Sequence, residues 1–172
     1  MFDVLLLLTA LTGQSDADPL APAREGKVQC YKPDVGKKTC MAISAFLPQA
    51  DGSWVNKATA LLDPAQGITM TTNSVVQATP TGVCGTVTRD DILKGSLTMG
   101  GGELPAEQGK PILEMVATAI EGMGMIGKPS CSAFAPDGDA LKSTVTIDGV
   151  AKPEFSQRVI WVSPDEGYKV GS

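Results

Sequence analysis

Four cysteines are the residues of this chain whose chemistry is easiest to predict. The chain has 172 residues, contains no histidine and has no C-x-x-C motif, and its cysteines are Cys30, Cys40, Cys84 and Cys131. An even number of separated cysteines without histidine is typical of a disulfide framework rather than a zinc or redox centre. Three pairings are possible, and we expect the sequential one. Cys30 then binds Cys40 across a turn at residues 33–36, and Cys84 binds Cys131.

Catalytic groups are scarce. Without histidine the commonest general base is missing, no S-x-x-K stands at a helix start, and no G-x-S-x-G motif occurs. The carboxylate pairs Asp90–Asp91 and Asp137–Asp139 are better explained as a helix start and a turn. The sequence therefore favours a protein without enzymatic activity and without a cofactor, and a small histidine-free hydrolase is the alternative.

Methionine offers the one metal hypothesis that this composition allows. Thioethers are soft ligands for Cu(I), and Met115, Met123 and Met125 lie in or just after a helical pattern. Methionine also fills gaps in apolar cores, and core packing is the simpler interpretation for the same residues. We therefore expect no metal site, with a methionine-based copper-binding protein as an alternative.

Aromatic side chains are the remaining candidates for ligand contact. Trp54 follows the turn sequence Asp51-Gly-Ser53 and is the best candidate for an exposed ring, followed by Tyr31 and Tyr168. Such rings stack on sugars, but packing at a hairpin edge is the favoured explanation for them. The ligand that they would bind is not indicated by the sequence.

The N-terminus resembles an export signal. Residues 4–11 are almost entirely apolar, too few to span a bilayer, and small residues follow at Ser15 and Ala17. We interpret residues 1–17 as a signal peptide, although Asp3 replaces the usual basic residues, and expect no membrane anchor after its removal. The net charge of −5 without a basic stripe argues against nucleic acid as a partner. Export to the bacterial periplasm or secretion agrees with the cysteines.

The remaining sequence predicts mainly strands. Residues 18–27 are expected to be a flexible mature N-terminus, and residues 28–172 a single globular domain. Apolar segments at 39–47 and 54–62 predict one hairpin, and those at 131–135 and 141–147 predict another. A smaller hairpin is expected from 68–72 and 75–78, split by Asn73-Ser74, and 159–162 predicts a central strand.

Two helices are predicted in the middle of the chain. Thr88 and Asp91 have the spacing of a capping box, which starts a short helix. Apolar residues recur at spacings of three and four through 111–123, and we expect this amphipathic helix to pack on the sheet. The predicted fold is therefore α+β, a mainly antiparallel sheet with one amphipathic helix and two disulfides.

The two hairpins beginning after Cys40 and Cys131 resemble each other. Gly36-Lys-Lys-Thr-Cys40 is followed by Ser44-Ala-Phe-Leu-Pro48, and Gly127-Lys-Pro-Ser-Cys131 by Ser132-Ala-Phe-Ala-Pro136. The similarity indicates a pseudo-repeat, with chance as the alternative. We hypothesise that this is a non-enzymatic, exported, small binding or envelope-associated protein. Its partner would be an unidentified protein or envelope component.

Overall fold

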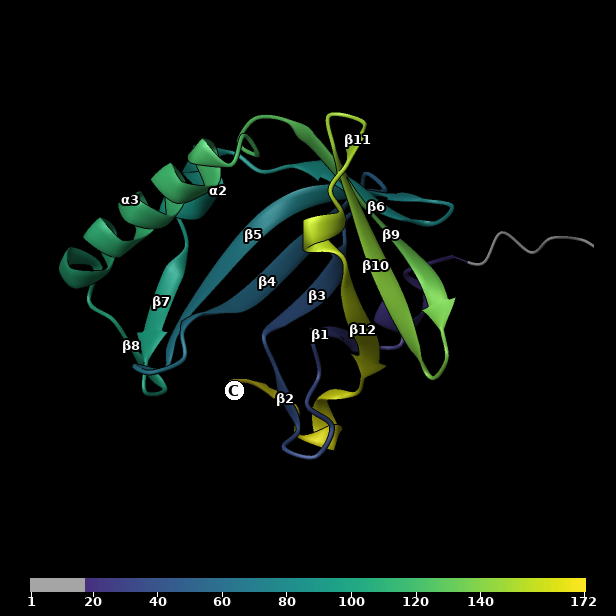
Figure 1. Ribbon diagram of the computed structural model, residues 1–172, viewed down its shortest axis with the longest axis horizontal. Coiled ribbons are helices and arrows are strands. Elements are labelled where there is room, and N and C mark those ends of the chain that lie inside the picture. The colour runs from purple at the N-terminus through teal and green to yellow at the C-terminus, as the bar shows by residue number, and fades with distance from the viewer. Residues whose placement is uncertain (1–17) are drawn as a thin grey trace, which may run out of the picture.

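A ring of antiparallel strands dominates the molecule, as the computed structural model shows for residues 18–172 (Figure 1). The elements in chain order are α1 (Ala21–Arg24), β1 (Val28–Tyr31), β2 (Thr39–Cys40), β3 (Ala42–Pro48), β4 (Trp54–Asp63), β5 (Ile68–Thr79), β6 (Gly82–Thr86), α2 (Arg89–Leu93), β7 (Ser96–Met99), β8 (Gly102–Glu103), α3 (Ala106–Gly122), β9 (Pro129–Asp137), β10 (Ala140–Ile147), β11 (Val150–Ala151), the 3₁₀ turn η1 (Pro153–Phe155), β12 (Gln157–Val162), η2 (Pro164–Glu166) and β13 (Lys169–Val170). The interpretation of residues 1–17 as a signal peptide lies outside the described residues.

Eight of the strands close into a barrel. Around the ring they follow the order β1, β3, β4, β5, β6, β9, β10 and β12, and β12 returns to pair with β1 from Val28–Val162 to Tyr31–Val159. The predicted α+β fold, a mainly antiparallel sheet with one amphipathic helix packed on it, is therefore wrong, because the sheet closes into a barrel. Closure depends on the pairing of β1 with β12, which no local pattern in the sequence reveals.

Local predictions fared better than the global one. The two hairpins β3–β4 and β9–β10 form as expected, and Thr88 with Asp91 makes the capping box at α2. Asp148 and Gly149 form the tight turn between β10 and β11, and both have positive φ angles, 53° and 74°. The small hairpin split at Asn73-Ser74 does not exist. Asn73 and Ser74 instead lie within β5, a continuous strand of 12 residues.

A unit comprising α2, β7, β8 and α3 is inserted between β6 and β9. The first residues of β5 pair with β7, whereas its last residues pair with β6, so this long strand serves both the barrel and the inserted unit. Ile68 and Met70 of β5 pack there against Leu113 and Ala117 of α3. The helix starts at Ala106 rather than at residue 111 and packs on the part of the sheet that β5 and β7 form.

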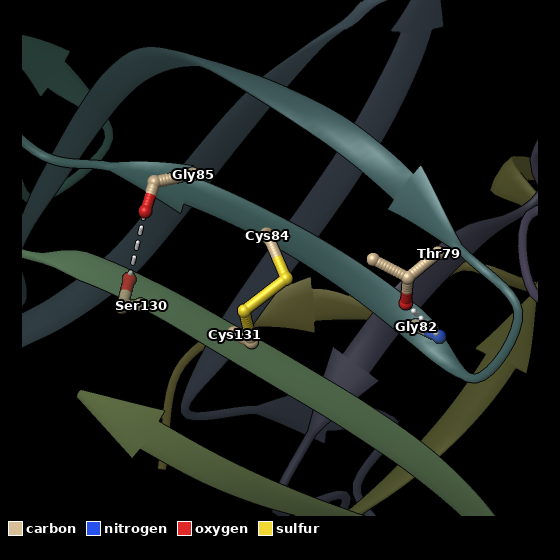
Figure 2. Close-up of a disulfide and its surroundings, with 6 residues drawn as sticks. All are labelled: Thr79, Gly82, Cys84, Gly85, Ser130 and Cys131. Carbon is tan, nitrogen blue, oxygen red and sulfur yellow. Dashed lines mark hydrogen bonds between the residues drawn. A yellow bond between two sulfur atoms is a disulfide. The ribbon is translucent and has the colours of Figure 1, made fainter. Parts of the chain in front are cut away.

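Both disulfides have the sequential pairing expected from the sequence. Cys30 of β1 is bonded to Cys40 of β2, and Cys84 of β6 to Cys131 of β9 (Figure 2). β6 and β9 approach each other very closely here. A Cβ added at Gly82 would lie only 1.8 Å from the carbonyl oxygen of Ser132, so only glycine fits at this position. Disulfides persist in oxidising surroundings, so the bridges indicate an exported protein.

Residues 18–27, which the sequence predicts to be flexible, include the short helix α1. Leu20, just before it, has no exposed surface, and Ala23 is also buried. Within residues 18–172, no helix combines the length and the apolar character needed to cross a membrane. The buried contacts of α1 close one end of the barrel and form part of the site described next.

Candidate functional site

An apolar cluster fills the barrel at the end that α1 closes. Side chains from six barrel strands, β3, β4, β5, β6, β9 and β12, meet there with α1 and with Leu20 just before it, which identifies the inner face of these strands. The cluster, named here the apolar plug, consists of Leu20, Ala23, Phe46, Trp54, Val76 and Val83, with Phe134 and Trp161 packed against it. Phe46 and Trp161 have ring centroids 6.3 Å apart in a tilted arrangement, a favourable aromatic geometry.

A cleft of about 810 Å³ opens beside the apolar plug. It lies between the start of α1, the β5–β6 turn, the β9–β10 hairpin and β12. Its apolar walls come from Phe134, Leu141, Val159 and Trp161, and four prolines line it as well: Pro19, Pro22, Pro80 and Pro136. The volume is within the range of small-molecule sites, and prolines make rigid walls that lose little entropy when a ligand binds. We name this feature the α1-end cleft.

Two carboxylates lie at the α1-end cleft, and each is paired with an arginine. Asp18 accepts hydrogen bonds from the Leu20 amide and the Arg24 guanidinium, both at 2.9 Å, and Asp139 pairs with Arg158 at 2.6 Å. The Leu20 amide first, and then Arg24, hold the pKa of Asp18 below its ordinary value of 3.8. Because both charges are compensated, the α1-end cleft is best suited to an uncharged ligand.

Arg24 also ties α1 to the barrel. Its guanidinium carbon lies 4.7 Å from the centre of the Trp54 ring, a cation–π contact, while the same side chain pairs with Asp18. Trp54 is only 2% exposed. The sequence-based expectation of an exposed Trp54 ring differs from this structure, because the alternation of β4 directs the first residue of the strand into the barrel.

A polar layer lies next to the apolar plug on the inner face of the barrel. It consists of Gln29, Tyr31, Ser44, Asn56 and Ser143, of which Gln29 is fully buried and Ser143 is 1% exposed. The Tyr31 hydroxyl donates to the Gln29 side-chain oxygen at 2.5 Å. Burial raises the pKa of Tyr31, and a hydrogen bond with Ser44 acts in the opposite direction. Tyr31 therefore stays protonated and serves as a hydrogen-bond donor rather than as a base.

The third aromatic candidate lies elsewhere. Tyr168 is half-buried on the outer side of the barrel, where it packs near Cys30, Cys40 and Val162 beneath the C-terminal strand β13. The structure thus brings Trp54 and Tyr31 to the barrel interior but keeps Tyr168 apart. The cysteine candidates form the two disulfides and are not part of the α1-end cleft.

The methionine candidates lie on the surface of the inserted unit. Met115 is 67% exposed and Met123 is 52% exposed. These two residues, which the sequence assigns to the apolar face of the helix, therefore lie outside the face that is buried in the structure. Eight residues of α-helix separate them by about 12 Å along the axis. Met125 follows α3 and is half-buried. Among residues 18–172, no three His, Cys, Asp or Glu side chains form a metal-binding group; the copper alternative stays a prediction.

The carboxylate pairs have structural partners. Asp91 accepts from the Thr88 amide at 2.8 Å in the capping box, and Asp90 forms an ion pair with Lys94. That ion pair raises the pKa of Lys94. Asp139 lies at the α1-end cleft, one residue past the turn glycine and two past Asp137. The described residues therefore offer a binding cleft with no activated nucleophile beside it.

Sequence reasoning missed the residues that shape the α1-end cleft. Trp161 lies within the apolar sequence Val159-Ile-Trp-Val162, which was interpreted as a central strand, and Phe134 lies in the second hairpin. Strand alternation would have placed Val159 and Trp161 on one face, but only closure of the barrel shows that this face is internal. No protein-family model matches the chain, and comparisons with curated proteins and with solved structures also return no match.

Proposed function

We propose that this protein is an exported, non-enzymatic carrier or receptor for a small uncharged apolar ligand, which binds in the α1-end cleft. The observation that carries the proposal is the cleft of about 810 Å³ lined by Phe134, Leu141, Val159 and Trp161. A concave apolar site of this size is the usual form of a small-molecule site. Its rim carboxylates are paired with Arg24 and Arg158, so apolar contact would dominate the affinity.

Export is supported by two independent features. The two disulfides fit an oxidising compartment, and residues 1–17 have the apolar run and small residues of a signal peptide. Periplasmic or secreted localisation, with an envelope component as the source or recipient of the ligand, fits both features. Detection of Met1 on the purified mature protein would contradict signal cleavage.

Binding is favoured over hydrolysis because the polar groups near the α1-end cleft are not arranged for catalysis. Tyr31 has a raised pKa and Ser143 is buried on the inner face of β10. Nucleophilic catalysis needs a base within hydrogen-bond distance of the nucleophile. The rim carboxylates Asp18 and Asp139 are occupied by arginines, as described above.

The proposal is tested by titrating the purified chain with N-phenyl-1-naphthylamine, an uncharged probe that fluoresces in apolar surroundings. We expect saturable binding, and Leu141→Ala should weaken it about fivefold because roughly 1 kcal/mol of apolar contact is lost. Leu47→Ala is the matched control, since Leu47 is 49% exposed on β3 and does not line the α1-end cleft. Equal binding by the two variants would contradict the proposed site.

A further inference from the structure

Among residues 18–172, two buried side-chain polar atoms in the barrel have no hydrogen-bond partner. They are the side-chain nitrogen of Gln29 and the side-chain oxygen of Asn56. Gln29 has no exposed surface, and its oxygen is already engaged by Tyr31. Leaving a buried polar group without a partner is unfavourable, so both atoms are expected to bind something that is not part of the protein chain.

These atoms lie close to the α1-end cleft. Gln29 is directly opposite Trp161 in the β1–β12 pair, and Asn56 is directly opposite Phe46 in the β3–β4 pair. Trp161 lines the α1-end cleft and also contacts Phe46 in the apolar plug. Directly opposite residues in an antiparallel pair have their side chains on the same face. The polar layer therefore begins where the aromatic lining of the cleft ends.

Ser143 makes the same connection from the other side of the barrel. It is directly opposite Phe134, and Leu141 precedes it on the same face of β10. Both Phe134 and Leu141 line the α1-end cleft, whereas Ser143 is 1% exposed. A ligand that passes the aromatic rings would thus leave apolar surroundings and meet amide and hydroxyl groups.

The chemistry of this layer specifies the group that it would bind. The Gln29 nitrogen is a donor and the Asn56 oxygen is an acceptor, so a group with both an acceptor and a donor satisfies both. The polar layer consists of uncharged side chains, and moving an ionised group into it without a counter-charge would be strongly unfavourable. A neutral amide or hydroxyl head is therefore favoured over a carboxylate.

We propose that the ligand is a neutral single-chain amphiphile, with its apolar chain in the α1-end cleft and an amide-like or hydroxyl head between Gln29 and Asn56. This inference rests on the proposed function, which it extends by naming the ligand class. Trp161 and Phe134 line the cleft and lie opposite Gln29 and Ser143 in their strand pairs, so entry of the head requires these rings to turn aside. The head then replaces the missing partners of two buried atoms.

The test compares three ligands of equal chain length as competitors of the fluorescent probe. Decanamide has a donor and an acceptor, methyl decanoate has an acceptor only, and decanoate is charged. We expect decanamide to bind about fivefold more tightly than methyl decanoate, which is the effect of one hydrogen bond, and decanoate to bind most weakly. Equal binding of decanamide and decanoate would overturn the proposal.

Two variants separate the roles of the buried atoms. Asn56→Leu should bring the ratio of the affinities for decanamide and methyl decanoate to about one. Gln29→Leu should instead lower the affinity for both ligands by a similar factor. Gln77→Leu is the control for the same substitution, because Gln77 is exposed on β5. An unchanged ligand preference in the folded Asn56 variant would contradict the assignment of that residue.

Nuclear magnetic resonance of the native chain provides a measurement that does not depend on the variants. Saturating decanamide should shift the side-chain amide resonances of Gln29. Probe displacement without such a shift would show that water alone completes the polar layer, which overturns this inference but leaves the proposed function standing. Failure of the probe to bind would instead contradict the proposed function, and the Gln29 resonances would then decide the head-group proposal by themselves.

Discussion

The barrel consists of two four-stranded halves that are built alike but lined differently. In the first half, β1, β3, β4 and β5 follow one another, and in the second half β6, β9, β10 and β12 do so. Each half has one disulfide: Cys30–Cys40 joins β1 to the short β2 that precedes β3, and Cys84–Cys131 joins β6 to β9. The segments whose sequences resemble each other, after Cys40 and after Cys131, occupy corresponding hairpins.

The linings of the two halves differ in polarity. Four of the five residues of the polar layer come from the first half, and Ser143 alone comes from the second. Phe134, Leu141, Val159 and Trp161, which line the α1-end cleft, all come from the second half. The apolar plug draws on both halves, with Phe46, Trp54 and Val76 coming from the first half. At the α1-end cleft, however, the second half supplies the apolar walls, and the first half supplies Gln29 and Asn56, whose side chains have atoms without a partner among the described residues.

The largest expected effect comes from removing a disulfide from either half. In the chain-entropy model, a bridge that closes 47 residues contributes about 4 kcal/mol to the free energy of unfolding and one that closes 10 residues about 3 kcal/mol. Replacing Cys84 and Cys131 by alanine should therefore destabilise the protein more than replacing Cys30 and Cys40. Urea unfolding of both double variants measures this, and the reverse order would show that loop length does not govern their contributions.

The next largest effect is expected at the two corresponding phenylalanines. Phe46 is 3% exposed within the apolar plug, whereas Phe134 is half-buried beside the α1-end cleft. Phe46→Ala should cost about 3 kcal/mol of unfolding free energy, and Phe134→Ala about half as much because its ring already has one open side. Denaturant unfolding tests the stability difference. Phe134→Ala should also weaken binding of the uncharged probe. If Phe46→Ala and Phe134→Ala lowered the unfolding free energy equally and weakened probe binding equally, the distinction between the two halves would be lost.

A smaller loss of unfolding free energy is expected from a substitution in the inserted unit. The Thr88 hydroxyl accepts from the Asp91 amide at 3.2 Å at the start of α2. Thr88→Ala should cost about 1 kcal/mol, the usual contribution of an N-cap. Hydrogen exchange should quicken in α2 more than in the barrel strands, with Thr86→Ala as the exposed control. Equal acceleration throughout the barrel would show that the inserted unit and the barrel unfold together.

The smallest effect is expected from acid at the α1 end. The pKa of Asp18 is lowered in the folded protein, so its ionised form stabilises the fold above pH 3.8, and this contribution disappears as the pH falls through the lowered pKa. Asp18→Asn should therefore be less stable than the native chain near pH 6 and equally stable at sufficiently acidic pH. Thermal unfolding across this range tests it; a difference that persists in acid would exclude ionisation as the cause.

The sequence predicted contacts between neighbouring residues better than contacts between residues far apart in the chain. The β3–β4 and β9–β10 hairpins and the capping box at Thr88 were predictable because neighbouring residues carry their signals. Closure of the barrel by β1 and β12 was not, because it joins residues more than a hundred positions apart. Met115 was misassigned to the buried face because a helical period alone does not show which apolar residues meet the sheet.

The site was less accessible to prediction than the fold. Trp54 and Tyr31 were singled out as aromatic candidates, but the sequence could not show that Trp54 is inside the barrel or that Tyr31 donates to Gln29. Gln29 and Asn56 gave no signal at all, since a polar residue in a short strand is ordinarily assigned to the solvent side. Their significance depends on the barrel being closed around them.

The central claim is that the second half of the barrel binds a small apolar ligand in the α1-end cleft. Nuclear magnetic resonance titration of the native chain with N-phenyl-1-naphthylamine tests it most directly. We expect saturable shifts at Phe134, Leu141, Val159 and Trp161 and none at Met115, which is 67% exposed on α3. Shifts confined to Met115 and its surroundings, or no shifts at a saturating concentration of the probe, would contradict it.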